Sequence, residues 1–404
     1  MMASLLTLTI VLGPSITPAF AAPARQITRK ARPSATATPI QYLVVIFQEN
    51  VSFDHYFGSY PNALNPPYEN KFKASPKTPT VNGLSNAVLN FNPNLNPANG
   101  TGASNPFRLD VLQAATADQD HNYLDEQLAY DAGLMDLFPL HAGNGKSQVM
   151  GYFDGNTVTA LWNYAQYFAM SDNSYSTTFG PSTPGVLNLV SGQTNTTIAP
   201  TVGNDETSGG PDGSFSVVGD PDPIGDVCSN PSRDQVTMTS SNIGDLLEAA
   251  GVTWGGFMGG FDLTITNPNG TTGCARSTKS NITGVTNVDY IPHHSFFDYW
   301  TSTSNLNHTR PNGVSEIGFD GPANHQYDIN DFFAAVTAGN QPAVSFLKAP
   351  AYEDGHAGYS DPIDEQVFLV NTLNFLQQQP NWNSTAAVIS VVTCESKIVQ
   401  NALL

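Results

Sequence analysis

The sequence predicts an α/β fold in which a layered, mostly parallel sheet is flanked by helices. Near-continuous apolar runs, typical of strands buried on both faces, lie at residues 42–48 and 386–392. Segments with the 3.6-residue apolar period of a helix alternate with such runs along the chain. With 404 residues, 40% of them hydrophobic, the chain can bury a large core.

The first expected elements are a strand at 42–48 and a helix at 156–168. Asn156 is the candidate N-cap of that helix, since a short polar side chain can accept a hydrogen bond from the first turn. A second helix is expected at 242–250, where Gly251 is placed to end it. A further strand begins directly afterwards.

The C-terminal third carries the clearest local signals. Residues 344–348 alternate like a strand. Asp361 can cap the next helix and Pro362 suits its first position, while Pro380 ends it. Its expected apolar stripe is Ile363, Val367, Val370 and Leu373. Residues 386–392 complete the set as another buried strand.

Two long segments between these elements have loop composition. Residues 60–107 are rich in Asn and Pro, and residues 192–225 in Gly, Asp and Pro. We expect both to form ordered loops or a small cap over the functional site.

Residues 1–21 resemble a secretory signal, with a short apolar core and a small-residue cleavage site before Ala22, although no basic residue precedes the core. The alternative is a disordered apolar tail. Residues 22–39 read as a flexible leader, so the folded domain is expected at 40–404 and its location is secreted or periplasmic. No later stretch is apolar for long enough to form a transmembrane segment.

The net charge of -19, from 15 basic and 34 acidic residues, excludes two classes of partner. Nucleic acids and anionic membrane surfaces both require a basic surface. If the substrate is itself anionic, the site needs its own positive charge, which a bound cation would supply.

The chain has three cysteines, Cys228, Cys274 and Cys394, and none has the spacing of a zinc site. Export favours disulfides, so a bridge between Cys228 and Cys274 is plausible. The alternative is a pair of free buried thiols.

Glu49 and Asn50 directly follow the first apolar strand. Ligands of open α/β sheets bind beyond the carboxyl ends of the strands. A carboxylate and an amide oxygen placed there can hold a divalent metal ion. The alternative is an ordinary strand end whose polar residues cap the next helix.

Ser182 lies in a turn bounded by Gly180 and Gly185, just before an apolar run at 186–190. A hydroxyl at the start of a helix is a good position for a nucleophile, because backbone N–H groups and the helix dipole can hold an anionic phosphoryl group there. A serine also needs a base or a metal for activation. Taken alone, this stretch is more often a turn with a capping hydroxyl.

Four of the eight histidines lie in polar clusters: His121, His293, His294 and His356. Neutral imidazole can bind metal, and imidazolium can hold phosphate or protonate a leaving alkoxide. Each alone is more often a structural or surface residue, but their number beside a metal site and a nucleophile favours function. The other four, His55, His141, His308 and His325, are expected to be structural.

Together these stretches resemble a bacterial phosphoesterase family that includes phosphatidylcholine-type phospholipases C and respiratory-burst-inhibiting acid phosphatases. The resemblance covers nearly all of residues 40–389, with the motifs in family order. The segments at 49–58, 180–184, 293–294 and 354–356 carry it. It implies an alkaline-phosphatase-like fold.

The resemblance also implies a hydrolase that acts on a small phosphate ester or a phospholipid head group. Glu49, Asn50 and Ser182 would bind one divalent metal ion of unknown identity, and Ser182 would be the nucleophile. His121, His293, His294 and His356 would be catalytic residues that hold the phosphoryl group or protonate the leaving group.

Two departures from the family pattern bear on activity. Gly185 stands where the family usually has Asn. After the strand at 386–392 the family has paired acidic residues that complete the metal site, whereas here Glu395 is the only nearby carboxylate. An alternative is therefore a catalytically impaired, truncated member that only binds phosphate esters. A secreted carbohydrate- or surface-binding module is a third reading, but it leaves the order of the motifs unexplained.

Overall fold

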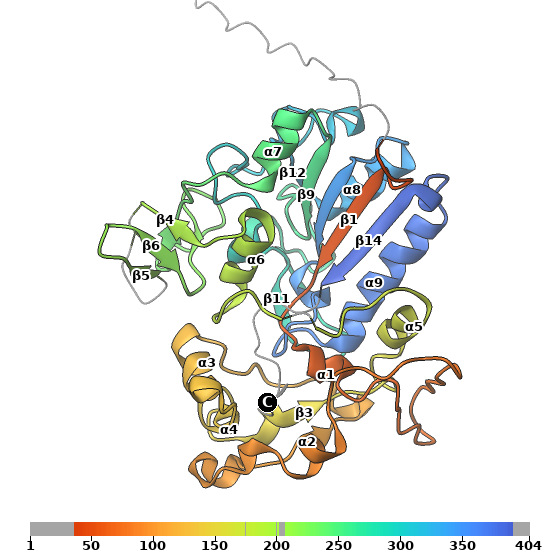
Figure 1. The fold of residues 1–404 in the computed structure, drawn as a ribbon. Coiled ribbons are helices and arrows are strands. Elements are labelled where there is room, and N and C mark those ends of the chain that lie inside the picture. Colours follow the sequence, from red (N-terminus) through yellow and green to blue (C-terminus); the bar gives the residue numbers. More distant parts are fainter. Residues whose placement is uncertain (1–35, 174, 199, 202–206, 391–404) are drawn as a thin grey trace, which may run out of the picture.

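The computed structural model describes residues 36–173, 175–198, 200–201 and 207–390. The expected signal segment, Cys394 and Glu395 lie outside the described residues. At the centre is a five-stranded sheet with the strand order β12-β9-β13-β1-β14, in which all neighbouring strands are parallel (Figure 1). Its strands are β1 (Tyr42–Phe47), β9 (Trp254–Met258), β12 (Gln326–Asp328), β13 (Val344–Lys348) and β14 (Thr385–Ser390).

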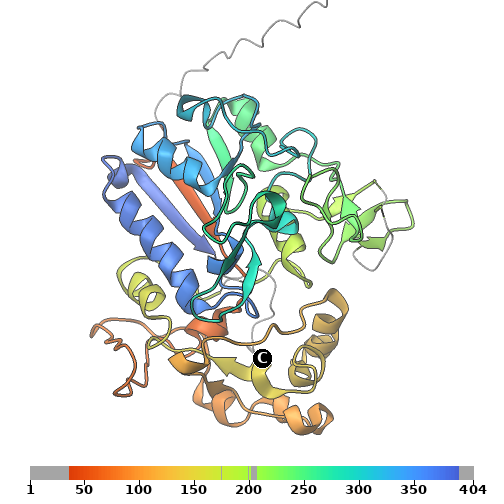
Figure 2. The same ribbon diagram turned by 180° about the vertical axis from the view of Figure 1, so that it is seen from behind.

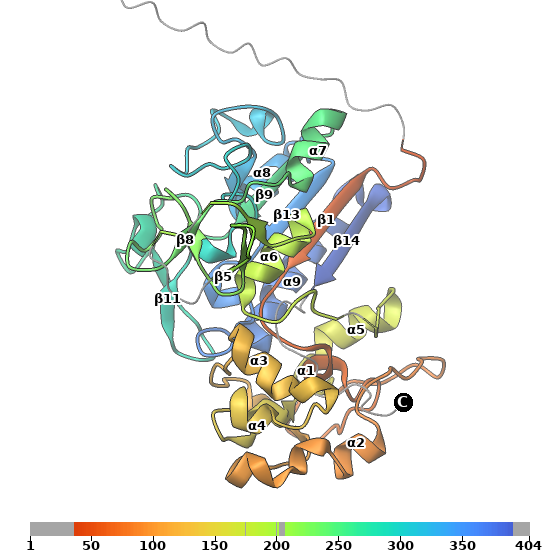
Figure 3. The same cartoon turned by 60° about the vertical axis from the view of Figure 1, so that its left-hand side comes forward.

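Helices cover both faces of the sheet. One face carries α6 (Ser182–Ser191) and α7 (Ile243–Ala250), which lie in front of the strands in Figure 3. The other carries α5 (Thr159–Tyr167), α8 (Ile329–Thr337) and α9 (Pro362–Gln377), seen from behind in Figure 2. Alternate residues of β1 point to opposite faces of the sheet. Val44 and Ile46 pack into the core beneath α5, α8 and α9, and Val45 and Phe47 pack into the core beneath α6 and α7. This double burial explains the continuous apolar run, and the predicted α/β class is confirmed.

Several predicted helix ends are confirmed at the level of single hydrogen bonds. Asn242 accepts from the Gly244 and Asp245 amides at the start of α7, and Gly251 ends the helix with a φ of 66°. Asp361 caps α9 by accepting from the Ile363 and Asp364 amides. These signals are local, so they do not depend on the rest of the fold.

Three local predictions were wrong. Asn156 does not cap α5, because its side chain instead bonds Asn65 and the Asn70 carbonyl. The expected stripe of α9 is displaced in part: Leu373 is buried as predicted, but Val367 is exposed, and Phe368, Leu369 and Leu376 are buried instead. The described part of the last strand, β14, is not buried, because it lies at the sheet edge, and Val388 is 49% exposed.

A small lobe lies beneath the carboxyl ends of the sheet strands (Figure 1). It has its own apolar cluster of Ala129, Phe138, Ala142 and Met150. Its elements are α1 (Phe53–Phe57), α2 (Asn86–Asn90), β2 (Phe107–Arg108), α3 (Tyr123–Tyr130), α4 (Phe138–His141) and β3 (Gly151–Tyr152).

Short strands make up most of the remaining regular structure. The segment expected as a loop or cap at 192–225 contains the three-stranded sheet β4-β6-β5. The short strands are β4 (Asn195–Thr196), β5 (Thr207–Gly209), β6 (Phe215–Val217), β7 (Asp222–Pro223), β8 (Gln235–Val236), β10 (Ser277–Lys279) and β11 (Thr286–Val288). The predicted disulfide is present between Cys228 and Cys274, whose Cα atoms are 5.2 Å apart. Among the described residues, no helix has both the length and the apolar character needed to cross a bilayer.

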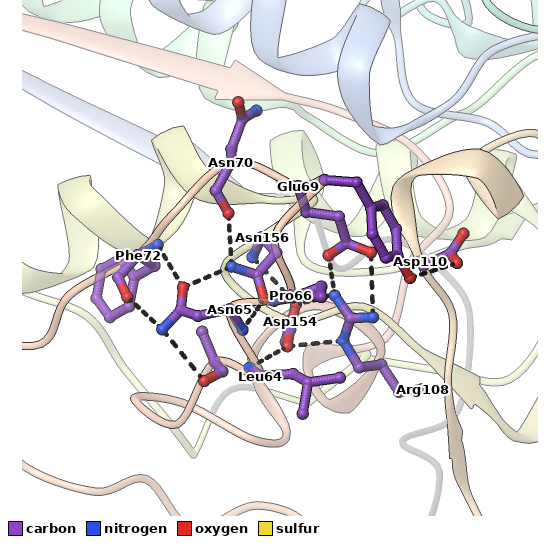
Figure 4. Close-up of polar contacts among 12 residues, drawn as sticks. Leu64, Asn65, Pro66, Glu69, Asn70, Phe72, Arg108, Asp110, Asp154 and Asn156 are labelled. Carbon is purple, nitrogen blue, oxygen red and sulfur yellow. Dashed lines mark hydrogen bonds and ion pairs between the residues drawn. The ribbon is translucent and has the colours of Figure 1, made fainter.

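A polar network fixes the Asn- and Pro-rich segment against β2 and β3 (Figure 4). The Arg108 guanidinium donates to both oxygens of Asp154, at 2.8 and 3.0 Å, and also pairs with Glu69. Both carboxylates are buried. Asp154 additionally accepts from the Leu64 amide at 2.8 Å. Arg108, directly after the segment, is therefore linked through these carboxylates to residues near its start.

We expect Arg108→Ala to lower the free energy of unfolding by about 3–5 kcal/mol, because two buried carboxylates lose their cation. Arg108→Lys should recover only part of the loss, since an ammonium cannot bridge both carboxylates as a guanidinium does. Urea denaturation of the three proteins measures the difference. An unchanged midpoint for Arg108→Ala would show that the network contributes little.

Candidate active site

Ser182 and Glu49 meet at the carboxyl end of β1. Ser182 is the first residue of α6, and its Oγ donates a hydrogen bond of 2.7 Å to Glu49 Oε2. Both residues are almost fully buried. Two sequence-predicted residues that are 133 positions apart therefore lie in direct contact.

The turn before Ser182 is possible only with glycine at position 180. Gly180 has a φ of 107°, and a Cβ there would lie 2.7 Å from the Val218 carbonyl oxygen. The Gly180 amide donates to Glu126 Oε2 at 2.6 Å, which anchors the turn to α3 of the small lobe. The position of the Ser182 hydroxyl is thus fixed by both parts of the molecule.

Lys348, which the sequence analysis missed, is the second partner of Glu49. It is the last residue of β13, and its ammonium pairs with Glu49 Oε1 inside the protein. The pairing follows from the sheet order, because β13 lies beside β1 and both strands end at the same edge. A lysine that closes a buried strand was the one available sequence signal.

Asn50 and His356 also contact each other, with 3.0 Å between Asn50 Nδ2 and His356 Nε2. His356 Nδ1 donates to the Ala357 carbonyl at 2.7 Å, so Nε2 is the nitrogen that accepts from the Asn50 amide. Burial lowers the pKa of His356. Asn50 adopts a φ of 80°, unusual for a residue other than glycine and typical of functional sites.

His294 approaches the two buried carboxylates of the site. Its Nδ1 lies 3.7 Å from Glu49 Oε1 and 3.8 Å from Asp354 Oδ2. Burial, reinforced by the charge of Lys348, holds the pKa of His294 well below its usual value, so the ring is neutral at pH 7. Burial and the Glu49 charge raise the pKa of Asp354 to about 8, against the opposing effect of Lys348.

His293 packs edge-to-face against His294, with 4.7 Å between ring centroids, and also contacts a separate group of charges. Its Nδ1 accepts from Arg233 at 2.8 Å, because a guanidinium can only donate. Its ring nitrogens also lie 3.5 Å from Asp222 and 3.9 Å from Asp220. Burial would raise the pKa of Asp220, but the neighbouring His293 and the Thr183 amide lower it. Arg233, Asp220 and Asp222 were not identified as site residues from the sequence.

His121 comes from the small lobe and faces His356. The two rings are 5.7 Å apart, and His121 Nδ1 donates to the Gln119 carbonyl at 2.7 Å. Asp118 Oδ1 lies 3.7 Å from the same nitrogen. The structure therefore brings all seven predicted site residues into one region, within which His293 belongs to the Arg233 side.

A cleft of about 650 Å³ opens beside these residues. Its lining includes three of the histidines, His121, His293 and His356, together with Pro181, the residue before Ser182. Four carboxylates and one guanidinium also line it: Asp118, Asp120, Asp220, Asp222 and Arg233. The formal charge of the lining is therefore negative when the histidines are neutral.

The donor set suits a small divalent cation in part. Ser182 Oγ and Glu49 Oε2, 2.7 Å apart, are close to the spacing of about 3 Å that two oxygens have on one octahedral ion. Asn50 would supply its carbonyl oxygen. The Lys348 ammonium already balances one charge of Glu49, so an ion there would have to share this carboxylate with the lysine.

Comparison with known proteins identifies relatives of the chain. A sequence model of the Phosphoesterase family matches residues 40–391. Two curated relatives, each called Phospholipase C A and found in two strains of Mycobacterium tuberculosis, are 25% identical to it over 151 residues. The alignment covers 33% of this chain and 26% of each relative, so the chain matches about a quarter of their length.

Proposed function

The chain belongs to the phosphoesterase family, and we propose that it hydrolyses phosphate esters with Ser182 as its nucleophile. The observation that carries this proposal is the 2.7 Å hydrogen bond from Ser182 Oγ to Glu49 Oε2 at the start of α6. The hydroxyl has an adjacent proton acceptor, and the helix start favours an anionic phosphoryl group.

In the first step Ser182 Oγ bonds to phosphorus, the bond to the ester oxygen breaks, and the serine proton passes to Glu49 Oε2. Water then attacks phosphorus, and the bond to Ser182 Oγ breaks. The proton held by Glu49 returns to Oγ, and the product leaves as phosphate from a monoester or as phosphorylcholine from a head-group ester. A divalent cation held by Glu49, Asn50 and Ser182 would supply Lewis-acid activation, lowering the pKa of the serine hydroxyl. The Lys348 ammonium pairs with Glu49 Oε1, which leaves Oε2 to receive the serine proton.

The histidines fit two separate tasks in this reaction. His293, held by Arg233, can donate from Nε2 to a phosphoryl oxygen, since its Nδ1 is occupied as an acceptor. His121 and His356 line the cleft, where a protonated His121 can pass a proton to the departing alkoxide. His294, neutral and buried, would act as a hydrogen-bonding partner of the buried carboxylates.

The charge of the cleft favours a substrate whose head group is cationic. Four carboxylates against one guanidinium repel a simple anionic ester but attract an ammonium head group. Among phosphate esters, we therefore propose the phospholipase C type of substrate, with a phosphorylcholine-like head group, over plain phosphomonoesters. The disulfide supports an exported, oxidising location, secreted or periplasmic.

The test is hydrolysis of a chromogenic phosphomonoester beside its phosphorylcholine analogue, with and without a chelator. We expect the analogue to have the higher kcat/KM and the chelator to abolish turnover. A preference for the monoester would overturn the assignment of the head group but keep the hydrolase. Failure to cleave either ester, with the protein folded and loaded with divalent metal, would overturn the function itself.

A further inference from the structure

His325, Glu248 and Asp320 form a second polar cluster, called here the His325 cluster. Glu248 lies on α7, Asp320 lies in the loop before β12, and His325 directly precedes β12. His325 also contacts Trp254, the first residue of β9, so the cluster lies at the amino end of the sheet. In Figure 1, α7 marks this end, far from the small lobe. None of its residues belongs to the candidate active site.

The hydrogen bond and packing of His325 fix both the tautomer and the orientation of its ring. Nδ1 donates to the Trp254 carbonyl at 2.9 Å, so in the neutral ring Nε2 carries a lone pair. The ring stacks on the Trp254 indole with 4.5 Å between centroids and 5° between planes. Metal-binding histidines adopt the same arrangement: one ring nitrogen donates to a carbonyl, and the lone pair of the other is left for the ion.

The buried Nε2 faces two carboxylates. Glu248 Oε1 lies 3.1 Å away and Asp320 Oδ1 lies 3.7 Å away. The His325 side chain is only 2% exposed, yet Nε2 makes no hydrogen bond to any of the described residues. A lone pair confronted by two negative oxygens is unfavourable, so the position requires a cation of some kind.

A proton on Nε2 explains the distances less well than a metal ion. A charge-assisted hydrogen bond from an imidazolium to a carboxylate is about 2.7–2.9 Å long. Donor atoms on one tetrahedral zinc-class ion, at bond lengths of about 2.0–2.2 Å, lie roughly 3.3–3.5 Å apart. The two observed distances, 3.1 and 3.7 Å, bracket that value.

We propose that the His325 cluster is a binding site for a zinc-class divalent cation. His325 Nε2, Glu248 Oε1 and Asp320 Oδ1 are its ligands, and their donor atoms all lie within 4.8 Å of one another. The Glu248 and Asp320 side chains are 36% and 64% exposed, so an ion can enter and water can complete the tetrahedron. The Trp254 indole donates to Glu248 Oε1 at 3.1 Å and orients that ligand. The ion would tie α7 to the loop before β12.

The test is Zn²⁺ binding by the whole protein. Native mass spectrometry gives the number of bound ions, and the thermal midpoint gives the stabilisation. Asp320→Asn is the central variant, because an exposed loop residue can be changed without loss of folding, and Glu248→Gln is the second. Glu316→Gln, on the same part of the chain but outside the cluster, is the matched control. Mg²⁺ is the ion control, since it favours all-oxygen ligands.

We expect the wild type and Glu316→Gln to bind one more Zn²⁺ than Asp320→Asn or Glu248→Gln. The extra ion should raise their Tm by roughly 2–5 °C at saturating Zn²⁺. Co²⁺ in place of zinc should add visible d–d absorption that the two ligand variants lack. Equal stoichiometry and equal Tm shifts in all four proteins would overturn the site.

Discussion

Ser182→Ala should reduce phosphate ester hydrolysis by at least about 10³-fold, as expected for the loss of a covalent nucleophile. The protein should remain folded, because the Ser182 Oγ hydrogen bond to the Glu49 carboxylate contributes only about 1.5–3 kcal/mol to stability. The measurement is kcat on the better of the two chromogenic esters, together with the urea midpoint of the same preparation.

Ser191→Ala is the matched control for this variant. Ser191 ends the same helix, and its Oγ bonds only the Leu187 and Gln193 carbonyls among the described residues, so full activity is expected. Acid quenching with a radiolabelled ester gives a second readout, since the wild type should trap a phosphoserine and Ser182→Ala should not. Comparable turnover by Ser182→Ala and the wild type would refute the serine mechanism.

Glu49→Gln should abolish activity and also lower the free energy of unfolding by about 3 kcal/mol. The amide leaves the buried Lys348 ammonium without a counter-charge, and uncompensated buried charges are expensive. It also removes the carboxylate proposed to accept the Ser182 proton. Kinetics and urea denaturation on the same variant measure the two effects separately.

The double variant Glu49→Gln/Lys348→Met separates stability from catalysis. Removing both charges should recover most of the lost stability, because no uncompensated charge then remains buried. Activity should stay absent, since the proton acceptor is still missing. If the double variant were no more stable than Glu49→Gln, the buried pair would not be the cause of the loss.

Much of the fold was predictable because its signals are local. The apolar run of β1, the caps at Asn242 and Asp361 and the terminating Gly251 each act within a few residues, and the structure confirms them. Ser182 at a helix start and Glu49 at a strand end were likewise placed by neighbouring residues. The Cys228–Cys274 bridge, which the expected export made plausible, is present.

The predictions that failed depend on neighbours that are distant in sequence. The side chain of Asn156 donates to Asn65 and to the Asn70 carbonyl, about 90 positions away, instead of capping the helix. The exposure of Val388 follows from the edge position of β14, which the residues of the strand do not encode. An apolar run is the same whether one or two strands lie beside it.

The sequence by itself determined the α/β class, the identity of the nucleophile candidate and the residues expected around it. Only the tertiary structure decided that Lys348, 299 positions from Glu49, shares its buried carboxylate, and that Arg233 holds His293. It also placed His325, expected to be structural, before two carboxylates. The physical reason is that capping hydrogen bonds and apolar periodicity involve residues close together in the sequence. The energy of a buried charge depends instead on which strands and loops become neighbours in space.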